Sequence, residues 1–238
     1  MPQTEVVRGR SGRAALLALG LLLTVAAQAT AQPSDSGPAV RIDGLAAIVG
    51  GDTPGPDSEV ILRSDVELRA RIALAGRTSG PLPLGPIPRG LMAATLRELI
   101  GEHLLSREAR RLAAARASAA EVVRERQRLM RSAGGGARLR ELLRAIGGRL
   151  AEIDAIAQRR ALVAAFLSAN LEGATVVTDA EVERAYAAEP ERFGELPREL
   201  AHAQLRAQLA RKALDETIAR WVEVLRARIP VRIYAEYQ

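Results

Sequence analysis

The sequence of 238 residues contains no cysteine, few aromatic residues and a single lysine, Lys212. The missing cysteine excludes disulfide bonds and thiolate metal sites. Aromatic residues make up 3% of the chain and hydrophobic residues 48%, so its core must consist mainly of leucine, alanine, valine and isoleucine. That composition favours helices, and the chain length fits one or two domains.

Motifs of common enzyme sites are also missing from the sequence. It contains no P-loop, GxSxG, HExxH or EF-hand pattern. The triple glycine at 134–136 follows an expected helix rather than a strand, so it predicts a helix end. His103 and His202 lie in expected helices without a second ligand at metal-binding spacing, and we expect both at the surface or its boundary. We therefore expect no catalytic residue, metal or cofactor.

Residues 1–31 have the pattern of a secretory signal peptide. Three arginines within residues 8–13 precede an apolar run over residues 14–27, and small-x-small cleavage sites end at Ala29 and Ala31. This pattern predicts export and no stable membrane anchor after cleavage. An uncleaved anchor is the alternative.

The charge pattern gives little support to nucleic-acid binding. The formal net charge is +6, but arginine and glutamate alternate along the expected helices, as they do on solvated surfaces. No basic block contains interleaved aromatic residues. We therefore expect no nucleic-acid partner.

Strand patterns occur at both ends of the expected mature chain. After a flexible segment over residues 32–39, strands are expected at 40–49 and 59–63, joined by the loop 50–58 into a hairpin. Residues 231–237 alternate apolar and polar side chains and predict a third strand. We expect this strand to pair with the hairpin; a frayed chain end is the alternative.

Helical periodicity fills most of the sequence between the hairpin and the last strand. Capping boxes predict helices that begin at Ser64, Ser118 and Thr178. The last helix carries one long apolar stripe and should lie against a large surface. The predicted fold class is mainly α, a multi-helix core with a small sheet formed by the hairpin and the C-terminal strand. Further helices are expected over residues 91–115, 139–146, 150–171 and 197–228.

Several segments follow, in order, the pattern of a known family. "IDGLAAIVGG" with "SEVILRSDVELRARI", then "TLRELIGEHLLSREARRL", resemble its opening hairpin and first two helices. "SAAEVVRERQRLM", "ARLRELLRAIG" and "VTDAEVERAYAAEPERF" are similar to the segments that come next, and "LRAQLARKALDETIARWVEVLRARIPVRI" is similar to its closing helix and strand. The family is that of the SurA-type periplasmic chaperones. The resemblance identifies residues 40–238 as one chaperone domain, in which helix 197–228 and strand 231–237 pack back on the N-terminal part.

Two departures from that family pattern change what the resemblance implies. The hairpin loop is lengthened by Pro54 and Pro56. The parvulin-type prolyl isomerase domain of many relatives is missing, because only Pro190 to about Arg198 separates the segments that would flank it. The resemblance therefore implies the chaperone core alone, without isomerase activity.

The function implied by the resemblance is that of an ATP-independent periplasmic holdase. Its partners would be unfolded exported polypeptides, chiefly outer-membrane protein precursors, and its oligomeric state is left open. A non-catalytic adaptor for one dedicated envelope partner is the second hypothesis, and an enzyme the third. Adaptable side chains suit promiscuous binding, which makes Met92, Met130, Tyr186 and Phe193 the client-binding candidates. Ordinary core packing is the alternative for each, and Trp221 is assigned to the core.

Overall fold

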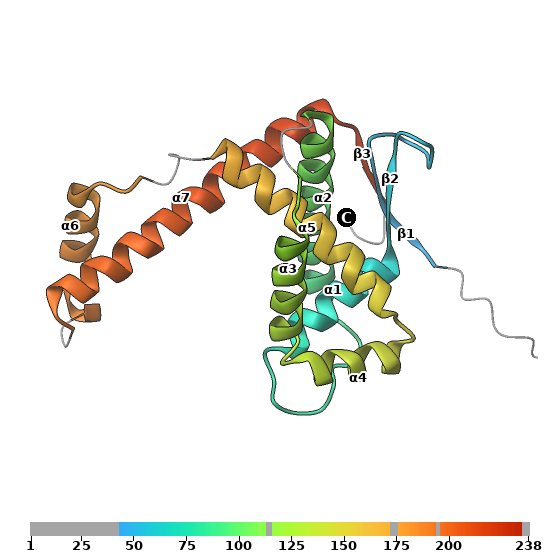
Figure 1. Cartoon of the computed structure of the whole chain (residues 1–238), viewed down its shortest axis with the longest axis horizontal. Coiled ribbons are helices and arrows are strands. Elements are labelled where there is room, and N and C mark those ends of the chain that lie inside the picture. The colour runs from blue at the N-terminus through green and yellow to red at the C-terminus, as the bar shows by residue number, and fades with distance from the viewer. Residues whose placement is uncertain (1–42, 113–115, 172–175, 194–195, 235–238) are drawn as a thin grey trace, which may run out of the picture. The chain divides into compact units, whose positions relative to one another are not determined.

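The computed structural model describes residues 43–112, 116–171, 176–193 and 196–234 (Figure 1). The expected signal peptide, the segment 32–39 and the outer ends of the first and last expected strands lie outside these ranges. The described part is mainly helical and contains a small antiparallel sheet, which confirms the predicted fold class. In chain order its elements are β1 (Leu45–Val49), β2 (Glu59–Leu62), α1 (Arg63–Ala75), α2 (Arg89–Leu112), α3 (Ala119–Ser132), α4 (Gly136–Ile146), α5 (Leu150–Asn170), α6 (Asp179–Ala188), the 3₁₀ helix η1 (Pro190–Phe193), α7 (Arg198–Arg228) and β3 (Val231–Ile233).

The sheet joins the two ends of the described chain. Its strand order is β2-β1-β3, with both pairs antiparallel. Ala47 in the middle strand lies opposite Ile61 on one side and Ile233 on the other. The predicted pairing of the C-terminal strand with the hairpin is therefore confirmed.

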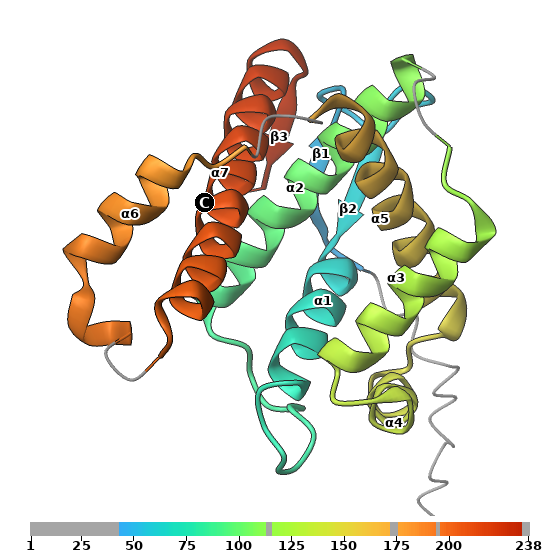
Figure 2. The same ribbon diagram turned by 60° about the vertical axis from the view of Figure 1, so that its left-hand side comes forward.

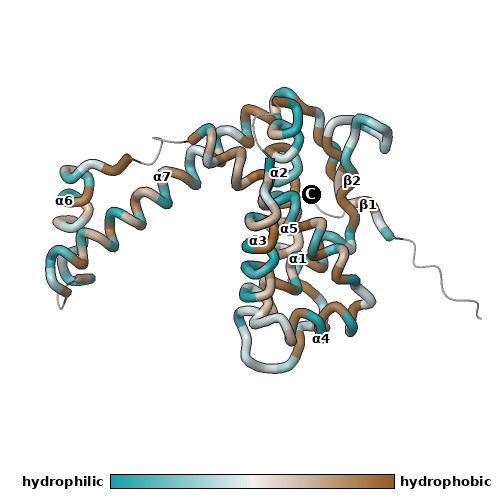
Figure 3. The backbone as a smooth tube through the Cα atoms, viewed as in Figure 1, coloured by the Kyte–Doolittle hydropathy of each residue, from teal (hydrophilic) through white to brown (hydrophobic). Residues whose placement is uncertain are grey.

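Strand β1 is buried because it has a strand on each side and helices α1 and α2 packed against the sheet. Residues 46–49 have no exposed surface. Figure 3 shows the hydrophobic residues along β1 and β2. A strand that is buried on both faces needs a near-continuous run of apolar residues, and β1 has one in LAAIV.

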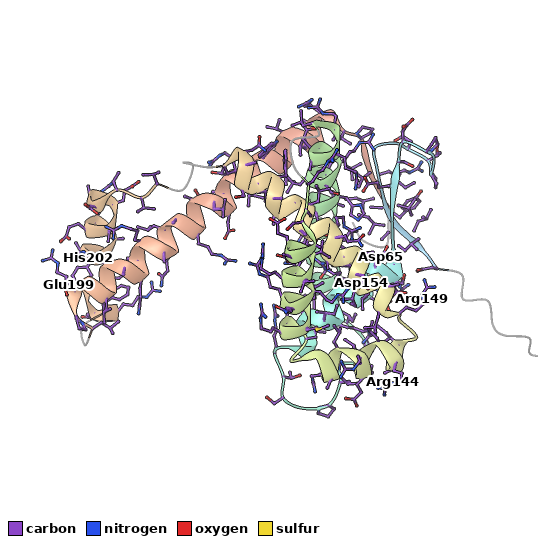
Figure 4. All side chains as sticks on the ribbon, viewed as in Figure 1. Asp65, Arg144, Arg149, Asp154, Glu199 and His202 are labelled. Carbon is purple, nitrogen blue, oxygen red and sulfur yellow. The ribbon has the colours of Figure 1, made fainter. Side chains whose placement is uncertain are left out.

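The first helix has its N-cap at Leu62, two residues before the predicted N-cap Ser64. Asp65, labelled in Figure 4, accepts a hydrogen bond from the backbone N–H of Leu62 at 2.9 Å. Ser64 instead donates from its backbone N–H (3.2 Å) and from its hydroxyl to the carboxylate of Asp43. The prediction of Ser64 as the N-cap was wrong, because Asp43, which precedes β1 in the sequence, takes its hydroxyl.

The other two capping boxes are confirmed. Ser118 Oγ accepts the N–H of Glu121 at 3.2 Å, and the Glu121 carboxylate accepts the N–H of Ser118 at 2.7 Å. Thr178 and Glu181 repeat the arrangement at 3.3 and 2.8 Å. The backbone N–H and the hydroxyl of the capping residue lower the pKa of each glutamate. Local sequence therefore fixes the starts of α3 and α6.

The apolar side chains form three clusters. The main core joins the sheet to α2, α5 and the C-terminal half of α7, and the ring of Trp221 packs against it, 4.9 Å from the ring of fully buried Phe166. A second cluster joins α1, α3, α4 and α5. The third joins α6 and η1 to the N-terminal half of α7.

Only the C-terminal part of the apolar stripe expected over residues 207–229 packs on the main core, which corrects the sequence-based expectation. Ile218, Trp221 and Leu225 pack there, whereas Ala207 at the other end of the stripe is exposed. Leu205, outside the stripe, packs with Val182 and Phe193 in the third cluster. Figures 1 and 2 show α6 alongside one half of α7 and α2 alongside the other. The length of α7 therefore serves two separate packing surfaces.

Replacing Val231 by Asp should test the buried face of β3. Val231 is half-buried against the main core, whereas Arg232 points outward. We expect Val231→Asp to lower the free energy of unfolding by about 2–3 kcal/mol, because it buries an unpaired charge. Arg232→Asp on the outer face should cost less than about 1 kcal/mol. Urea denaturation followed by circular dichroism measures both, and equal losses would contradict the observed strand orientation.

Candidate functional site

A groove of about 1040 Å³ opens to solvent between α7 and the helices α2, α3 and α5. Most of its accessible lining is apolar, and charged side chains from all four helices complete it. All of its residues lie within the four helices, so the groove depends on helix packing rather than on a loop. The apolar residues that line it are Gly101, Leu105, Val163, Ala164, Leu167, Ile218, Ala219, Val222 and Val224.

The glycine in the middle of α2 lies beside α7. A Cβ atom on Gly101 would lie 3.6 Å from both methyl groups of Val222, which is an ordinary van der Waals contact. A longer side chain would have to enter the space that Val222 occupies. The two helices therefore lie close together at Gly101, where Val222 packs against the main core, while Val224 is 55% exposed on the groove.

A buried carboxylate holds the α2 side of the groove in place. Glu102 accepts hydrogen bonds from Arg69 of α1 at 2.9 Å and from Arg159 of α5 at 2.7 Å. Its side chain is only 11% exposed. Burial alone would raise the pKa of Glu102, but the charges of Arg69 and Arg159 and the hydrogen bond from Arg159 outweigh it and lower the pKa. Glu102 is therefore ionised and ties α1, α2 and α5 together.

A second carboxylate holds the side of the groove formed by α3 and α5. Glu125 is nearly buried; one oxygen accepts a hydrogen bond from Arg128, and the other lies 3.6 Å from Arg160 Nε. Glu102, Glu125, Arg128 and Arg160 all line the groove. Each of the two carboxylates thus faces two guanidinium groups.

The charged residues on the α7 side are more exposed. Asp215 lies 3.8 Å from Arg211, and Glu223 lies 3.8 Å from Arg226. Exposed pairs of this kind contribute little to stability. The fixed charges of the groove therefore belong to α2, α3 and α5.

The four client-binding candidates chosen from the sequence lie outside the residues that line this groove. Met92 is buried in the main core and Phe193 in the third cluster, which fits the alternative of core packing for both. Met130 is half-buried against the second cluster. Tyr186 is half-buried and stacks on Phe193, with ring centroids 6.1 Å apart. The structure thus brings together only Tyr186 and Phe193.

The groove residues themselves were not singled out in the sequence. Gly101 lies inside the expected helix 91–115, at a position where the sequence predicts no turn. A glycine at such a position is the one local indication that another helix approaches closely. The alternation of arginine and glutamate predicts solvated charges along the helices, and it does not single out Glu102, because its two arginine partners are 33 and 57 residues away. Sequence spacing on one helix cannot reveal pairs of this kind.

One of the two histidines is more buried than expected. His103 is 7% exposed, and its Nδ1 lies 2.6 Å from Glu59 Oε2 at the start of β2. Burial alone would raise the pKa of Glu59, but the hydrogen bond and charge of His103, with Arg110, lower it. The expectation of a surface or boundary residue was therefore wrong for His103, which links the hairpin to α2.

The second histidine lies at the boundary, as expected. His202, labelled in Figure 4 near the start of α7, is half-buried. Its Nε2 is 3.5 Å from a Glu183 oxygen, and its ring meets that of Tyr186 edge-on at 5.1 Å. It helps to hold α6 on α7.

The described ranges contain no group of three or more histidine or acidic residues that could hold a metal ion. Within the same ranges, no helix combines the length and the apolar character needed to cross a membrane. The sequence matches no protein-family model and no curated protein. The groove beside α7 is therefore the candidate functional site of the described chain.

Replacing Gly101 by Ala should stabilise the protein. Alanine in a helix interior is favoured over glycine by about 0.5–1 kcal/mol, and its Cβ would make an ordinary contact with Val222. We expect a gain of that size in the free energy of unfolding, measured in urea. Gly90→Ala, near the start of the same helix and with no atom within 4 Å, is the control for helix propensity alone.

A longer side chain at the same position tests the helix approach. Gly101→Leu should cost about 1–3 kcal/mol, because its side chain overlaps Val222. A stabilising Gly101→Leu would show that α2 and α7 are further apart than the structure has them.

The ionised state of Glu102 should make stability depend on pH. Because its pKa is lower in the folded chain than its ordinary value of 4.5, the carboxylate stabilises the fold above pH 4.5. This contribution falls as the pH drops through the lowered pKa. We expect Glu102→Gln to cost about 3 kcal/mol at pH 7 and much less at pH 3, in urea titrations at both values.

Exposed Glu98 on the same helix provides the matched control for this pH dependence. Glu98→Gln should change the free energy of unfolding by less than about 0.5 kcal/mol at either pH. A loss for Glu102→Gln that is equal at pH 7 and pH 3 would contradict the ionised state of Glu102.

Proposed function

We propose that this chain is an ATP-independent periplasmic holdase that binds apolar segments of unfolded exported polypeptides in the groove beside α7. The observation that carries the proposal is an open, mostly apolar groove of about 1040 Å³ built from four helices. Concave, largely apolar sites of several hundred Å³ or more are typical of ligand binding. The signal-peptide pattern and the resemblance to SurA-type chaperones point to exported polypeptides as its ligands.

A holdase needs a surface that binds apolar segments reversibly and without a nucleotide. Unfolded outer-membrane proteins expose strands with alternating apolar residues, which aggregate through their edges and faces. In the groove, half-buried Leu167 of α5 and Ile218 and Val224 of α7 offer apolar contact from two helices. Contacts to both helices allow several weak interactions with one segment, and release requires no chemical step.

The electrostatics of the groove favour binding over acid–base catalysis. A general acid or base works best with a pKa near the operating pH. The arginines beside Glu102 lower its pKa below the ordinary value of 4.5, which is further from a neutral operating pH. The paired carboxylates are therefore suited to holding the groove in shape.

A non-catalytic adaptor for one dedicated envelope partner is the second candidate function. It is favoured by the ion pairs of Glu102 and Glu125, which fix the shape of one side of the groove. Promiscuous binders more often use flexible, methionine-rich surfaces, and here Met92 and Met130 lie elsewhere. A fixed groove would select a narrower set of partners.

Aggregation suppression tests the first proposal. Denatured outer-membrane porin is diluted into buffer with the purified chain and no nucleotide, and light scattering is followed. We expect near-stoichiometric amounts to suppress scattering. Val224→Asp places a charge on exposed apolar surface of the groove, and removal of one such contact should raise the amount needed by about tenfold.

The matched control is Val123→Asp on α3. Val123 is 48% exposed and lies outside the residues that line the groove, so its replacement should leave suppression unchanged. Equal loss with both variants would contradict the groove as the binding site. Failure of the folded wild-type chain to suppress porin aggregation would overturn holdase activity and favour the dedicated adaptor, to be sought by crosslinking in the envelope.

A further inference from the structure

The backbone of the described residues that line the groove is fully hydrogen-bonded. These residues fall within 97–105 of α2, 125–128 of α3, 160–167 of α5 and 215–224 of α7. Each range lies far enough inside its helix that its N–H and C=O groups bond to residues four positions away. Where the α5 range reaches the last turn, the carbonyl of Leu167 accepts the N–H of Leu171 at 2.8 Å. A bound chain therefore finds only side chains as partners here.

An extended segment is poorly suited to such a lining. A strand forms its backbone hydrogen bonds with a neighbouring strand, and the described sheet contributes none of the residues that line the groove. The N–H and C=O groups of an extended segment that face the apolar side chains of the groove would lack partners, which is unfavourable. A helix bonds its interior backbone groups within itself. The helix is therefore the conformation that lies on this lining at the lowest cost.

The dimensions of the groove fit a short helix. Figure 2 shows α2 between α5 and α7, and α2 packs against both. The groove follows α2 from Arg97 to Leu105 and α7 from Asp215 to Val224, which are lengths of about 12 to 14 Å. A helix about 10 Å across and about 13 Å long has a volume of about 1000 Å³, close to the 1040 Å³ of the groove. That length corresponds to about nine residues.

Small side chains on both sides leave room for such a helix. Ala164 on α5 and Ala219 on α7 are exposed and line the groove. Two helix axes can lie about 8 Å apart where the contacting side chains are small, and about 10 Å apart where they are large. Half-buried Leu167 and Ile218 and exposed Val224 supply apolar contact for one face of the bound helix. The groove is therefore shaped like the empty position of a further helix beside α2, α5 and α7.

We infer that the groove binds its polypeptide segment as an amphipathic α-helix of about two to three turns rather than as an extended strand. This inference rests on the proposed function, because it specifies the conformation in which the holdase binds a segment. An alternating strand sequence also has apolar residues at i, i+4 and i+8, which share one helix face. A strand-forming segment that is held as a helix has no free edge to pair with another strand, so it cannot aggregate in that way.

Matched peptides test the bound conformation. Three fluorescein-labelled peptides contain the same apolar residues at helical spacing and differ only at one central position on the opposite face, which is alanine, glycine or proline. Fluorescence anisotropy with the full chain measures their dissociation constants. Relative to alanine, we expect glycine to weaken binding about fivefold and proline about a hundredfold, in the order of helix propensity. Infrared spectra with isotope-labelled peptide carbonyls should show the helical amide band when the alanine peptide binds.

Substitutions of the chain show where the helix binds. Ala164→Leu and Ala219→Leu narrow the groove, and each should weaken binding of the alanine peptide about tenfold, because the added side chain overlaps the bound helix. Ala155→Leu is the control, because Ala155 is exposed on the same helix α5 and lies outside the groove lining. It should leave the affinity unchanged. Urea denaturation verifies the fold of each variant, and a variant that unfolds is replaced by the valine substitution at the same position.

The outcomes separate this inference from the proposed function. Equal binding of the three peptides, with porin aggregation still suppressed, would overturn the helical conformation and leave the holdase intact. Absence of peptide binding together with absence of suppression would overturn both. Unchanged affinity in Ala164→Leu and Ala219→Leu would overturn the inference by placing the bound helix outside the groove. A dimer in sedimentation equilibrium that Ala219→Leu dissociates would overturn it by assigning the groove to a second copy of the chain.

Discussion

The burial of α2 on nearly every side is the constraint on which the structure depends. The helix contacts the sheet, α1, α5 and α7, so its polar side chains must find partners on neighbouring elements. Glu102 is paired with Arg69 and Arg159, and His103 with Glu59. Loss of such a partner leaves an uncompensated charge or donor in the interior. These pairs therefore fix how α1, α5 and β2 lie around α2.

The groove follows from the same packing. Gly101 on α2 lies against Val222 of α7, and the two buried carboxylates hold α3 and α5 on the other side. The apolar residues between them lie on helix faces that no other element of the described chain covers. A groove built on paired, buried charges keeps its shape when it is empty, and preformed shape lowers the cost of binding.

Several elements could be predicted from local sequence. The Ser118 and Thr178 capping boxes depend on atoms three residues apart, so both were predicted correctly. The alternation at the C-terminus predicted a strand that pairs with the hairpin, and β3 lies beside β1. The box at Ser64 failed because Asp43, 21 residues away, takes the serine hydroxyl. The four binding candidates were chosen by residue type alone, and two of them are buried in separate cores.

The sequence by itself determined the helical class, the starts of α3 and α6 and the sheet that pairs the hairpin with the C-terminal strand, because hydrophobic periodicity and capping act over a few residues. Only the tertiary structure decided which helix faces remain open and which charges are paired. Glu102 and Arg159 lie 57 residues apart, and α7 packs on the main core with its C-terminal half and on α6 and η1 with its N-terminal half. Long-range pairing depends on the register and crossing of helices, which arise from side-chain packing across the whole fold.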